Sequence, residues 1–322
     1  MSRRVVALTG GVGGAKLARG LVERLGPEDL VFVVNVGDDF EHLGLHVSPD
    51  LDTLLYTLSD EANPELGWGR RDESWQFIDA LARYGGPTWF RLGDRDLATH
   101  VTRTQALAAG RTLTEVTAEL GRALGIRHAM LPVTDDPLRT VVETAEGSLA
   151  FQHYFVRERC APAVTGFRFD GADEARPSAA VLAALADPAL DGVVICPSNP
   201  FVSVDPILAV PGMRDALGAV SAPIVAVSPI IGGDALKGPA AKMMDELGVP
   251  RSTDAVAAHY GARRDGGLLD GFVIDRVDAA LEGRVDALGL RAHVTNTVMQ
   301  SLDDRMALAD AVLAFLNEPG LR

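Results

Sequence analysis

The chain has 322 residues, 47% of them hydrophobic, which is enough to bury a large core, either as one α/β domain or as a core with an added lobe. Its net charge of −14 at pH 7, without a basic cluster, argues against nucleic acid or an anionic membrane as the main partner. Cys160 and Cys196 match no metal-binding spacing, and no apolar segment approaches the length of a membrane span. The chain starts directly with a strand rather than a signal peptide, so we expect a cytoplasmic protein.

The first chemical pattern is a short apolar strand, residues 4–8, followed by a turn with four glycines and a helix. The turn either packs the helix closely on the strand or forms a phosphate site from backbone amides and the helix N-terminus, and we favour the phosphate site. The Walker A pattern is broken because Leu17 follows the lysine, and the dinucleotide pattern is broken because Lys16 replaces its third glycine. The predicted phosphate-binding residues here are Thr9, Gly10, Gly11, Gly13, Gly14 and Lys16.

A second apolar strand, residues 30–34, leads into residues 38–52, which carry five carboxylates and which glycine and proline predict to be largely loop. In a purely structural interpretation Asp50 caps a helix over residues 51–58 and Asp39 faces water. In a functional one several of these carboxylates hold Mg²⁺ beside phosphates on the glycine turn. The predicted metal ligands are Asp38, Asp39, Asp50 and Asp52, and His42 and His46 are weaker candidates.

The next segment predicts a helix over residues 72–84, a strand over 88–92 and a turn at which Asp94 caps the following helix. Arg91 and Arg95 flank this turn. In a purely structural interpretation they are surface residues, and Arg95 forms an ion pair with Asp96 that contributes little free energy. In a functional one they recognise a planar or phosphorylated ligand. Two more helices are expected over residues 98–109 and 113–124, the second with a capping box.

The fold class that these elements indicate is α/β, a Rossmann-like, mostly parallel sheet flanked by helices, with an additional smaller hairpin-containing lobe. Short strands over residues 139–143, 148–156 and 164–169 mark the lobe. We divide the chain into a first core part (1–130), the hairpin lobe (131–175) and a second core part (176–322).

The second core part contains two strands, residues 192–196 and 224–227, that end in Pro-Ser-Asn-Pro and Ser-Pro-Ile-Ile-Gly-Gly. Rigid strand ends of this kind suit a nucleotide base or ribose held by backbone groups. Lys237 would reach a phosphate or simply be exposed. The predicted nucleotide contacts are Ser198, Asn199, Ser228 and Gly232. Further strands over 272–274 and 288–294 and a helix over 303–316 complete the core.

Taken together, several motifs closely resemble the 2-phospho-L-lactate transferase family, which makes the deazaflavin coenzyme F420. They are Thr9 to Lys16, Asn35-Val36-Gly37-Asp38-Asp39, Ser48-Pro49-Asp50-Leu51-Asp52-Thr53, Leu92-Gly93-Asp94-Arg95-Asp96, Cys196 to Pro200 and Ser228 to Gly233. The regulatory proteins that resemble gluconeogenesis factor share the glycine turn and the Asp-Asp turn but should lack the Leu-Gly-Asp-Arg-Asp block. A non-catalytic nucleotide-binding regulator of that type is therefore the alternative.

The resemblance implies a Rossmann-like core with an extra lobe, commonly a homodimer, that uses Mg²⁺. Such enzymes take a three-carbon acid joined through a diphosphate to guanosine. They pass the phosphorylated acid to the ribityl hydroxyl of 7,8-didemethyl-8-hydroxy-5-deazariboflavin and release GMP. The family's deazaflavin contacts map onto Asp52 and Arg91. Phosphoenolpyruvate, 2-phospholactate and phosphoglycerate all remain open as the transferred group.

Attack of a hydroxyl on a diphosphate needs charge neutralisation and positioning. Our hypothesis is that the glycine turn and Mg²⁺ hold the diphosphate, while Asp50 and Asp52 hold metal and acceptor. Asp52 is the first candidate for the base that takes the hydroxyl proton. Arg91 and Arg95 complete the expected acceptor site. An NAD-dependent enzyme in which Asp38 binds ribose is disfavoured by the broken dinucleotide pattern.

Overall fold

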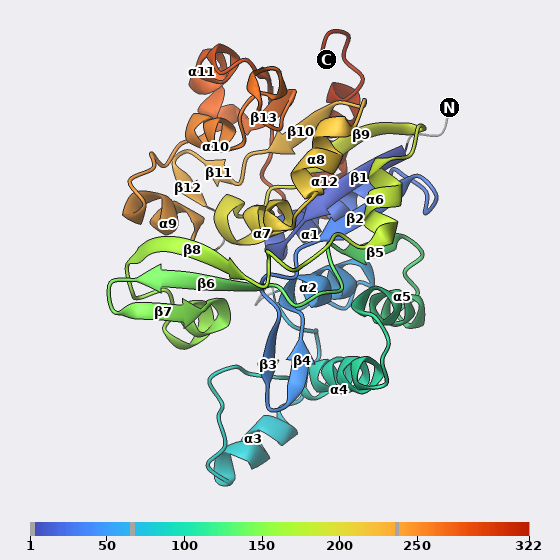
Figure 1. The fold of residues 1–322 in the computed structure, drawn as a ribbon, viewed down its shortest axis with the longest axis vertical. Coiled ribbons are helices and arrows are strands. Elements are labelled where there is room, and N and C mark those ends of the chain that lie inside the picture. Colours follow the sequence, from blue (N-terminus) through green and yellow to red (C-terminus); the bar gives the residue numbers. More distant parts are fainter. Residues whose placement is uncertain (1–3, 65–67, 236–237, 322) are drawn as a thin grey trace.

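A seven-stranded parallel sheet forms the core of the computed structural model, which describes residues 4–64, 68–235 and 238–321 (Figure 1). The strands follow the order β14-β13-β10-β9-β1-β2-β5. Their bounds are β1 (Arg4–Thr9), β2 (Leu30–Val34), β5 (Ala129–Pro132), β9 (Leu190–Ile195), β10 (Ile224–Val227), β13 (Gly271–Asp275) and β14 (Arg291–Thr295). The strand order reverses between β1 and β9. In open α/β sheets this switch point is where ligands bind, outside the carboxyl ends of the strands.

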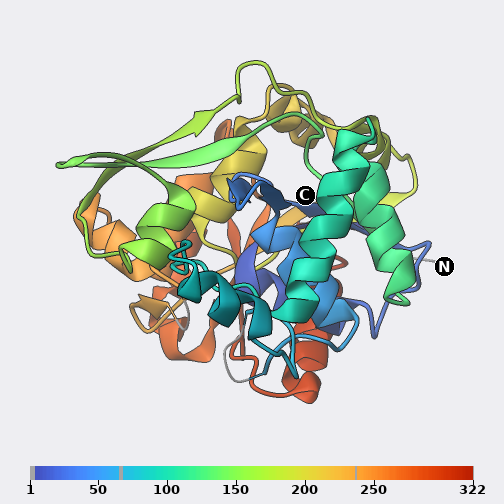
Figure 2. The same ribbon diagram turned by 90° about the horizontal axis from the view of Figure 1, so that it is seen from below.

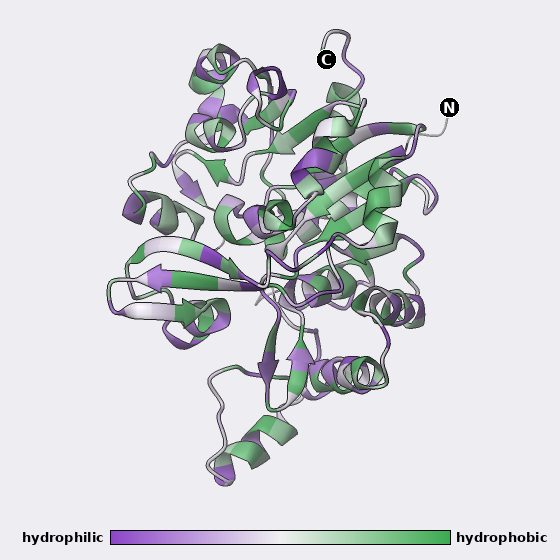
Figure 3. Cartoon of the chain, viewed as in Figure 1, coloured by the Kyte–Doolittle hydropathy of each residue, from purple (hydrophilic) through white to green (hydrophobic). Residues whose placement is uncertain are grey.

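The central strands are mostly apolar, with charged residues only near their ends, because helices cover both faces of the sheet. All residues of β10 and β13 are buried, and the central strands are accordingly hydrophobic in Figure 3. In the register of the sheet, Val6 of β1 lies between Val31 of β2 and Val193 of β9. The predicted Rossmann-like core is confirmed.

The described residues contain twelve α-helices, and α1 packs against both α2 and α12. In Figure 2 the helices α4 and α5 lie side by side. None of the described helices is long and apolar enough to cross a membrane. The helices are α1 (Gly11–Leu21), α2 (Pro49–Leu58), α3 (Gln76–Arg83), α4 (Asp94–Ala108), α5 (Leu113–Ala123), α6 (Ala179–Leu185), α7 (Asp205–Ala209), α8 (Met213–Ala219), α9 (Ala240–Glu246), α10 (Thr253–Tyr260), α11 (Glu282–Ala287) and α12 (Leu302–Phe315).

The expected hairpin lobe is a separate three-stranded antiparallel sheet of β6 (Arg139–Thr144), β7 (Gly147–Ala150) and β8 (Val164–Asp170), in the order β7-β6-β8. Its base touches the core where the amide of Thr140 donates to the carbonyl of Gly37 at 2.7 Å. Strand β5 belongs to the core sheet and ends at Pro132, so its last two residues fall within the segment predicted as the lobe.

Three local predictions are wrong. Residues 88–92 form no strand, since their aromatic side chains pack on a neighbouring hairpin instead of entering a sheet. That hairpin, β3 (Phe40–His42) with β4 (Leu45–Val47), occupies part of the acidic segment that we expected to be loop. Residues after β7 turn into a π-helix, η1 (His153–Arg157), where a continuous strand was expected.

The predicted cap at Asp94 is also wrong, because its partner lies in another helix. Asp94 is the first residue of α4, but its carboxylate accepts hydrogen bonds from the amides of Gln76 and Phe77 at the start of α3. The capping box at the start of α5 is confirmed, since Thr112 and Glu115 bond each other's amides. Local sequence identifies a capping side chain more readily than the helix it caps.

Candidate active site

A cavity of about 600 Å³ opens at the carboxyl ends of β1, β2, β9 and β10, at the switch point of the sheet. Its volume is in the range of sites for small molecules and cofactors. The fold therefore brings together predicted residues from segments far apart in the sequence. Those that line the cavity are Gly10, Gly11, Gly13, Lys16, Asp38, Asp50, Arg91, Ser198, Asn199 and Ser228.

The glycine turn is the first turn of α1 itself, packed closely against the end of β9. A Cβ atom on Gly13 would overlap the carbonyl oxygen of Pro197, and one on Gly14 would overlap the hydroxyl of Thr9. These two glycines therefore permit close packing, the structural alternative for this turn. Thr9 and Gly14 are not among the described residues that line the cavity.

The amides of the turn face polar groups of the site. The Gly10 amide donates to the Ser198 hydroxyl at 3.2 Å, and the Gly11 amide donates to Asp50 Oδ1 at 2.7 Å. The carboxylate of Asp50 thus lies at the N-terminus of α1, where the helix dipole favours negative charge. The predicted cap of α2 by Asp50 is wrong, because Asp50 lies within α2, whose N-cap is Ser48.

Asp38 and Asp50 form a pair of buried carboxylates bridged by one amide. Asn35 Nδ2 lies 3.0 Å from Asp38 Oδ1 and 2.9 Å from Asp50 Oδ2. Burial and the charge of Asp50 raise the pKa of Asp38 well above its usual range, and burial raises the pKa of Asp50 to about 6. Two such carboxylates in a cavity wall fit a hard cation. Its positive charge would offset both the cost of burying the two negative charges and the repulsion between them.

This pair is smaller than the predicted four-carboxylate metal site. Within the described residues no three His, Cys, Asp or Glu side chains converge as a metal group would require. Mg²⁺ commonly takes only one or two carboxylates and completes its shell with water and substrate phosphates. The pair is therefore compatible with the expected Mg²⁺, which stays a prediction.

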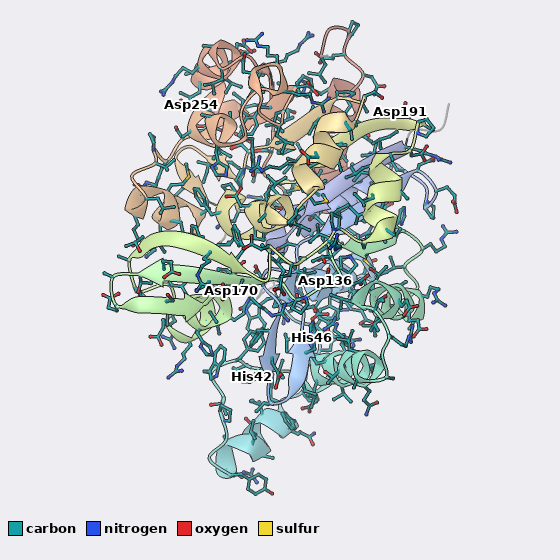
Figure 4. All side chains as sticks on the ribbon, in the orientation of Figure 1. His42, His46, Asp136, Asp170, Asp191 and Asp254 are labelled. Atoms are coloured by element: carbon teal, nitrogen blue, oxygen red, sulfur yellow. The ribbon has the colours of Figure 1, made fainter. Side chains whose placement is uncertain are left out.

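Asp39 and Asp52 have partners other than the pair, and neither lines the cavity in the described part of the chain. Asp39 accepts from the Ser48 hydroxyl at 2.8 Å and lies 3.0 Å from His46 Nε2. His42 and His46 belong to the β3–β4 hairpin, as Figure 4 shows. The metal roles of Asp39 and Asp52 and the catalytic role of Asp52 remain predictions without support from this geometry.

Asp52 belongs to a buried ionic network between α2 and α4. Its carboxylate binds both terminal nitrogens of Arg103, a fully buried side chain, and this ion pair raises the pKa of Arg103 against the effect of burial. His100 lies 3.2 Å from Asp96, which accepts from the Tyr56 hydroxyl at 2.7 Å. Sequence analysis missed Arg103 because nothing in its helical pattern distinguishes it from a surface arginine.

Of the other predicted ligand contacts, some line the cavity and some do not. The guanidinium of Arg91 stacks on the ring of Trp75 at 4.2 Å and lines the cavity, whereas the exposed Arg95 does not belong to the described lining. The Gly232 amide donates to the carboxylate of Asp278 and is also outside the lining. Lys237 lies outside the described residues.

Several aromatic side chains, which we call the aromatic end, line the cavity and were not predicted. The rings of Phe151 and Phe155 stack with centroids 5.5 Å apart and planes 6° apart, and Phe90 and Arg91 face the same cavity. Sequence reasoning missed these residues because it assigned both segments to strands. The missed lining residues at this end are Trp68, Phe90, Phe151, Gln152, Phe155 and Val156.

The sequence profile of 2-phospho-L-lactate transferase CofD matches residues 5–300 of the chain. The chain belongs to the 2-phospho-L-lactate transferase family. A phosphoenolpyruvate transferase of Streptomyces griseus is 42% identical over 320 residues, covering 98% of this chain and 99% of the relative. One of Mycobacterium avium is 41% identical over 344 residues, with 99% of each chain covered.

A UPF0052 family protein of Bacillus halodurans has a similar solved structure, with a TM-score of 0.63 and 18% identity over 97% of this chain and 99% of that chain. This likeness concerns the fold alone. Family membership confirms the prediction of a transferase of the 2-phospho-L-lactate type in coenzyme F420 biosynthesis. It also disfavours the alternative of a non-catalytic regulator.

Proposed function

We propose that this family member passes a phosphoenolpyruvyl group from a guanosine-diphospho donor to the ribityl hydroxyl of 7,8-didemethyl-8-hydroxy-5-deazariboflavin and releases GMP. The observation that carries the proposal is a single cavity lined by two chemically different sets of residues. The glycine turn and the carboxylate pair form one set, which we call the polar end, and the aromatic side chains of the aromatic end form the other. The transfer needs a diphosphate and a flat heterocycle next to each other.

The polar end suits the donor. The first turn of α1 contributes Gly11, Val12 and Gly13 to the cavity wall, and a helix N-terminus attracts phosphate. Lys16 lines the same wall and donates to the carbonyl of Met299 at 3.1 Å. Ser198 and Ser228 stand at the ends of β9 and β10, where guanosine would lie.

The aromatic end suits the acceptor. The rings of Phe90, Phe151 and Phe155 offer apolar faces to a planar ring system. Arg91, held over Trp75, is placed to bind the polar groups of a deazaflavin or its ribityl chain. In this proposal Arg91 contacts the deazaflavin, whereas Asp52 does not and instead positions α2 through its ion pair with Arg103.

In the proposed reaction the ribityl oxygen forms a bond to the phosphorus that carries the three-carbon acid. The bond from that phosphorus to the bridging oxygen breaks, and GMP leaves with the electron pair. Among the described carboxylates Asp38 and Asp50 line the cavity, so we assign the hydroxyl proton to this pair. The same two residues would hold Mg²⁺, which supplies positive charge to the phosphates when bound.

The choice of phosphoenolpyruvate is supported by the names of the relatives, since several proteins at 41–42% identity over nearly the whole chain are phosphoenolpyruvate transferases. Lactyl and glyceryl donors differ from the enolpyruvyl donor only at the three-carbon end. Nothing in the described lining discriminates among them by charge.

Titration calorimetry with Mg²⁺ tests the two ends separately. We expect GDP and the deazaflavin each to bind, and to bind together, because they occupy different ends of the cavity. NAD should give no heat of binding. Binding of NAD without binding of the deazaflavin would overturn the proposal.

A further inference from the structure

Gln152 is a polar side chain in the aromatic end of the cavity. Only 4% of its surface is accessible, and it belongs to the cavity lining. It directly precedes the π-helix η1, between Phe151 and Phe155. π-Helical turns are rare and often occur at functional sites, where the wide turn redirects a side chain.

The side-chain amide of Gln152 makes no hydrogen bond with any described residue, and neither of its polar atoms is among the fully buried side-chain atoms without a partner, so the amide stays open to the cavity. By contrast, Asn199, another amide side chain of the lining, accepts from the Phe201 amide at 3.0 Å. A ligand in the cavity can therefore use both the donor and the acceptor of this amide without breaking a hydrogen bond of the protein.

The surroundings select the class of ligand. Phe151, Phe155 and Phe90 present aromatic surface, and Val156 adds an apolar contact. A flat heterocycle would lie against these rings, and its polar edge would then meet the single uncharged amide among them. A side-chain amide offers one donor group and one acceptor, so it pairs best with an edge that carries both.

We infer that Gln152 reads the pyrimidinedione edge of the deazaflavin, pairing with its ring N3–H and an adjacent carbonyl, and so selects the acceptor. This inference rests on the proposed function and adds a specificity-determining residue to it. A deazaflavin that cannot pair with this amide should bind poorly, because a site built to hydrogen-bond a ligand discriminates strongly against ligands that lack the matching group.

The experiment measures binding of the deazaflavin and of its N3-methyl analogue by calorimetry, in wild type and in Gln152→Leu. In the wild type we expect N3-methylation to weaken binding about tenfold or more, as for loss of a buried hydrogen bond. In Gln152→Leu the deazaflavin itself should bind about tenfold more weakly, and methylation should have almost no further effect. Equal losses on methylation in both proteins would overturn the inference.

Three measurements separate this outcome from misfolding and from failure of the proposed function. Gln152→Leu should keep wild-type affinity for GDP, which also reports that it is folded, and Gln152→Glu, which retains an acceptor, should give an intermediate affinity for the deazaflavin. Gln105→Leu, at an exposed position of α4, is the matched control and should change nothing. If Gln152→Leu weakens GDP alone, the amide reads the donor and the inference is wrong. If wild type binds GDP but no deazaflavin, the proposed function fails with it.

Discussion

The carboxylate of Asp50 accepts a hydrogen bond from the backbone amide of Gly11 at 2.7 Å, so a side chain from one helix occupies the N-terminus of another. Asn35 ties the same carboxylate to Asp38. The glycine turn and the acidic pair are therefore one hydrogen-bonded unit. A change in the charge of Asp50 should be felt by metal and phosphate binding together.

Protonation should control the effect of Mg²⁺. Burial raises the pKa of Asp50 to about 6 in the folded protein, so without metal its contribution to the free energy of unfolding is lost as pH rises from about 4 through 6. Mg²⁺ requires the charged carboxylate. We therefore expect the rise in melting temperature caused by Mg²⁺ to be small at pH 5 and large at pH 7, and to be absent in Asp50→Asn. A rise that does not depend on pH would contradict the assignment.

The close packing of the glycine turn predicts a large effect of one methyl group. Gly13→Ala would drive a Cβ into the carbonyl of Pro197, and overpacking of this kind costs about 1–3 kcal/mol. Gly218, in helix α8, has open space around it and a permissive backbone, so Gly218→Ala should be neutral or stabilising by up to about 1 kcal/mol. Urea denaturation distinguishes the two, and equal midpoints would refute the packing argument.

The ion pair of Asp52 with Arg103 should matter for stability more than a surface pair. Arg103→Met leaves a buried carboxylate without its partner and should lower the free energy of unfolding by about 3–5 kcal/mol. The double variant with Asp52→Asn should recover much of this loss. Denaturation of the two single variants and the double variant measures the coupling, and strictly additive losses would show that the pair is not coupled.

Arg91 and Arg95 provide a matched pair of variants for the proposed acceptor site. Arg91 lines the cavity and Arg95 does not, although they lie four residues apart. We expect Arg91→Ala to weaken deazaflavin binding about tenfold, the usual scale for a charged hydrogen-bonding partner. Arg95→Ala should stay within about twofold of wild type. Calorimetry with the deazaflavin tests this, and a larger loss for Arg95→Ala would reverse the assignment.

Sequence reasoning succeeded where parallel-sheet geometry decides the outcome. Apolar runs identified the central strands, and the carboxyl ends of parallel strands meet at one edge, so Asp38, Ser198 and Ser228 were correctly expected near the glycine turn. It failed where a partner lies far along the chain. Asp94 caps α3 instead of its own helix, and Asp52 is neutralised by an arginine 51 residues away.

The aromatic lining of the cavity could not be predicted from local sequence patterns for a different reason. Aromatic residues favour strands, and residues 88–92 and 151–156 are rich in them. Tertiary packing overrides that preference. The loop before α4 packs its rings on the β3–β4 hairpin, and the segment after β7 turns into η1. Gln152 is placed by that turn, so no spacing in the sequence indicated it.

The central claim is that the polar and aromatic ends of one cavity bring a guanosine-diphospho donor and a deazaflavin together. The most direct test is the initial rate of GMP release when the protein and Mg²⁺ are mixed with the deazaflavin and, side by side, the enolpyruvyl, lactyl or glyceryl donor. We predict the fastest release with the enolpyruvyl donor, and release only when the deazaflavin is present. GMP release that does not depend on the deazaflavin, or no release with any donor, would contradict the account.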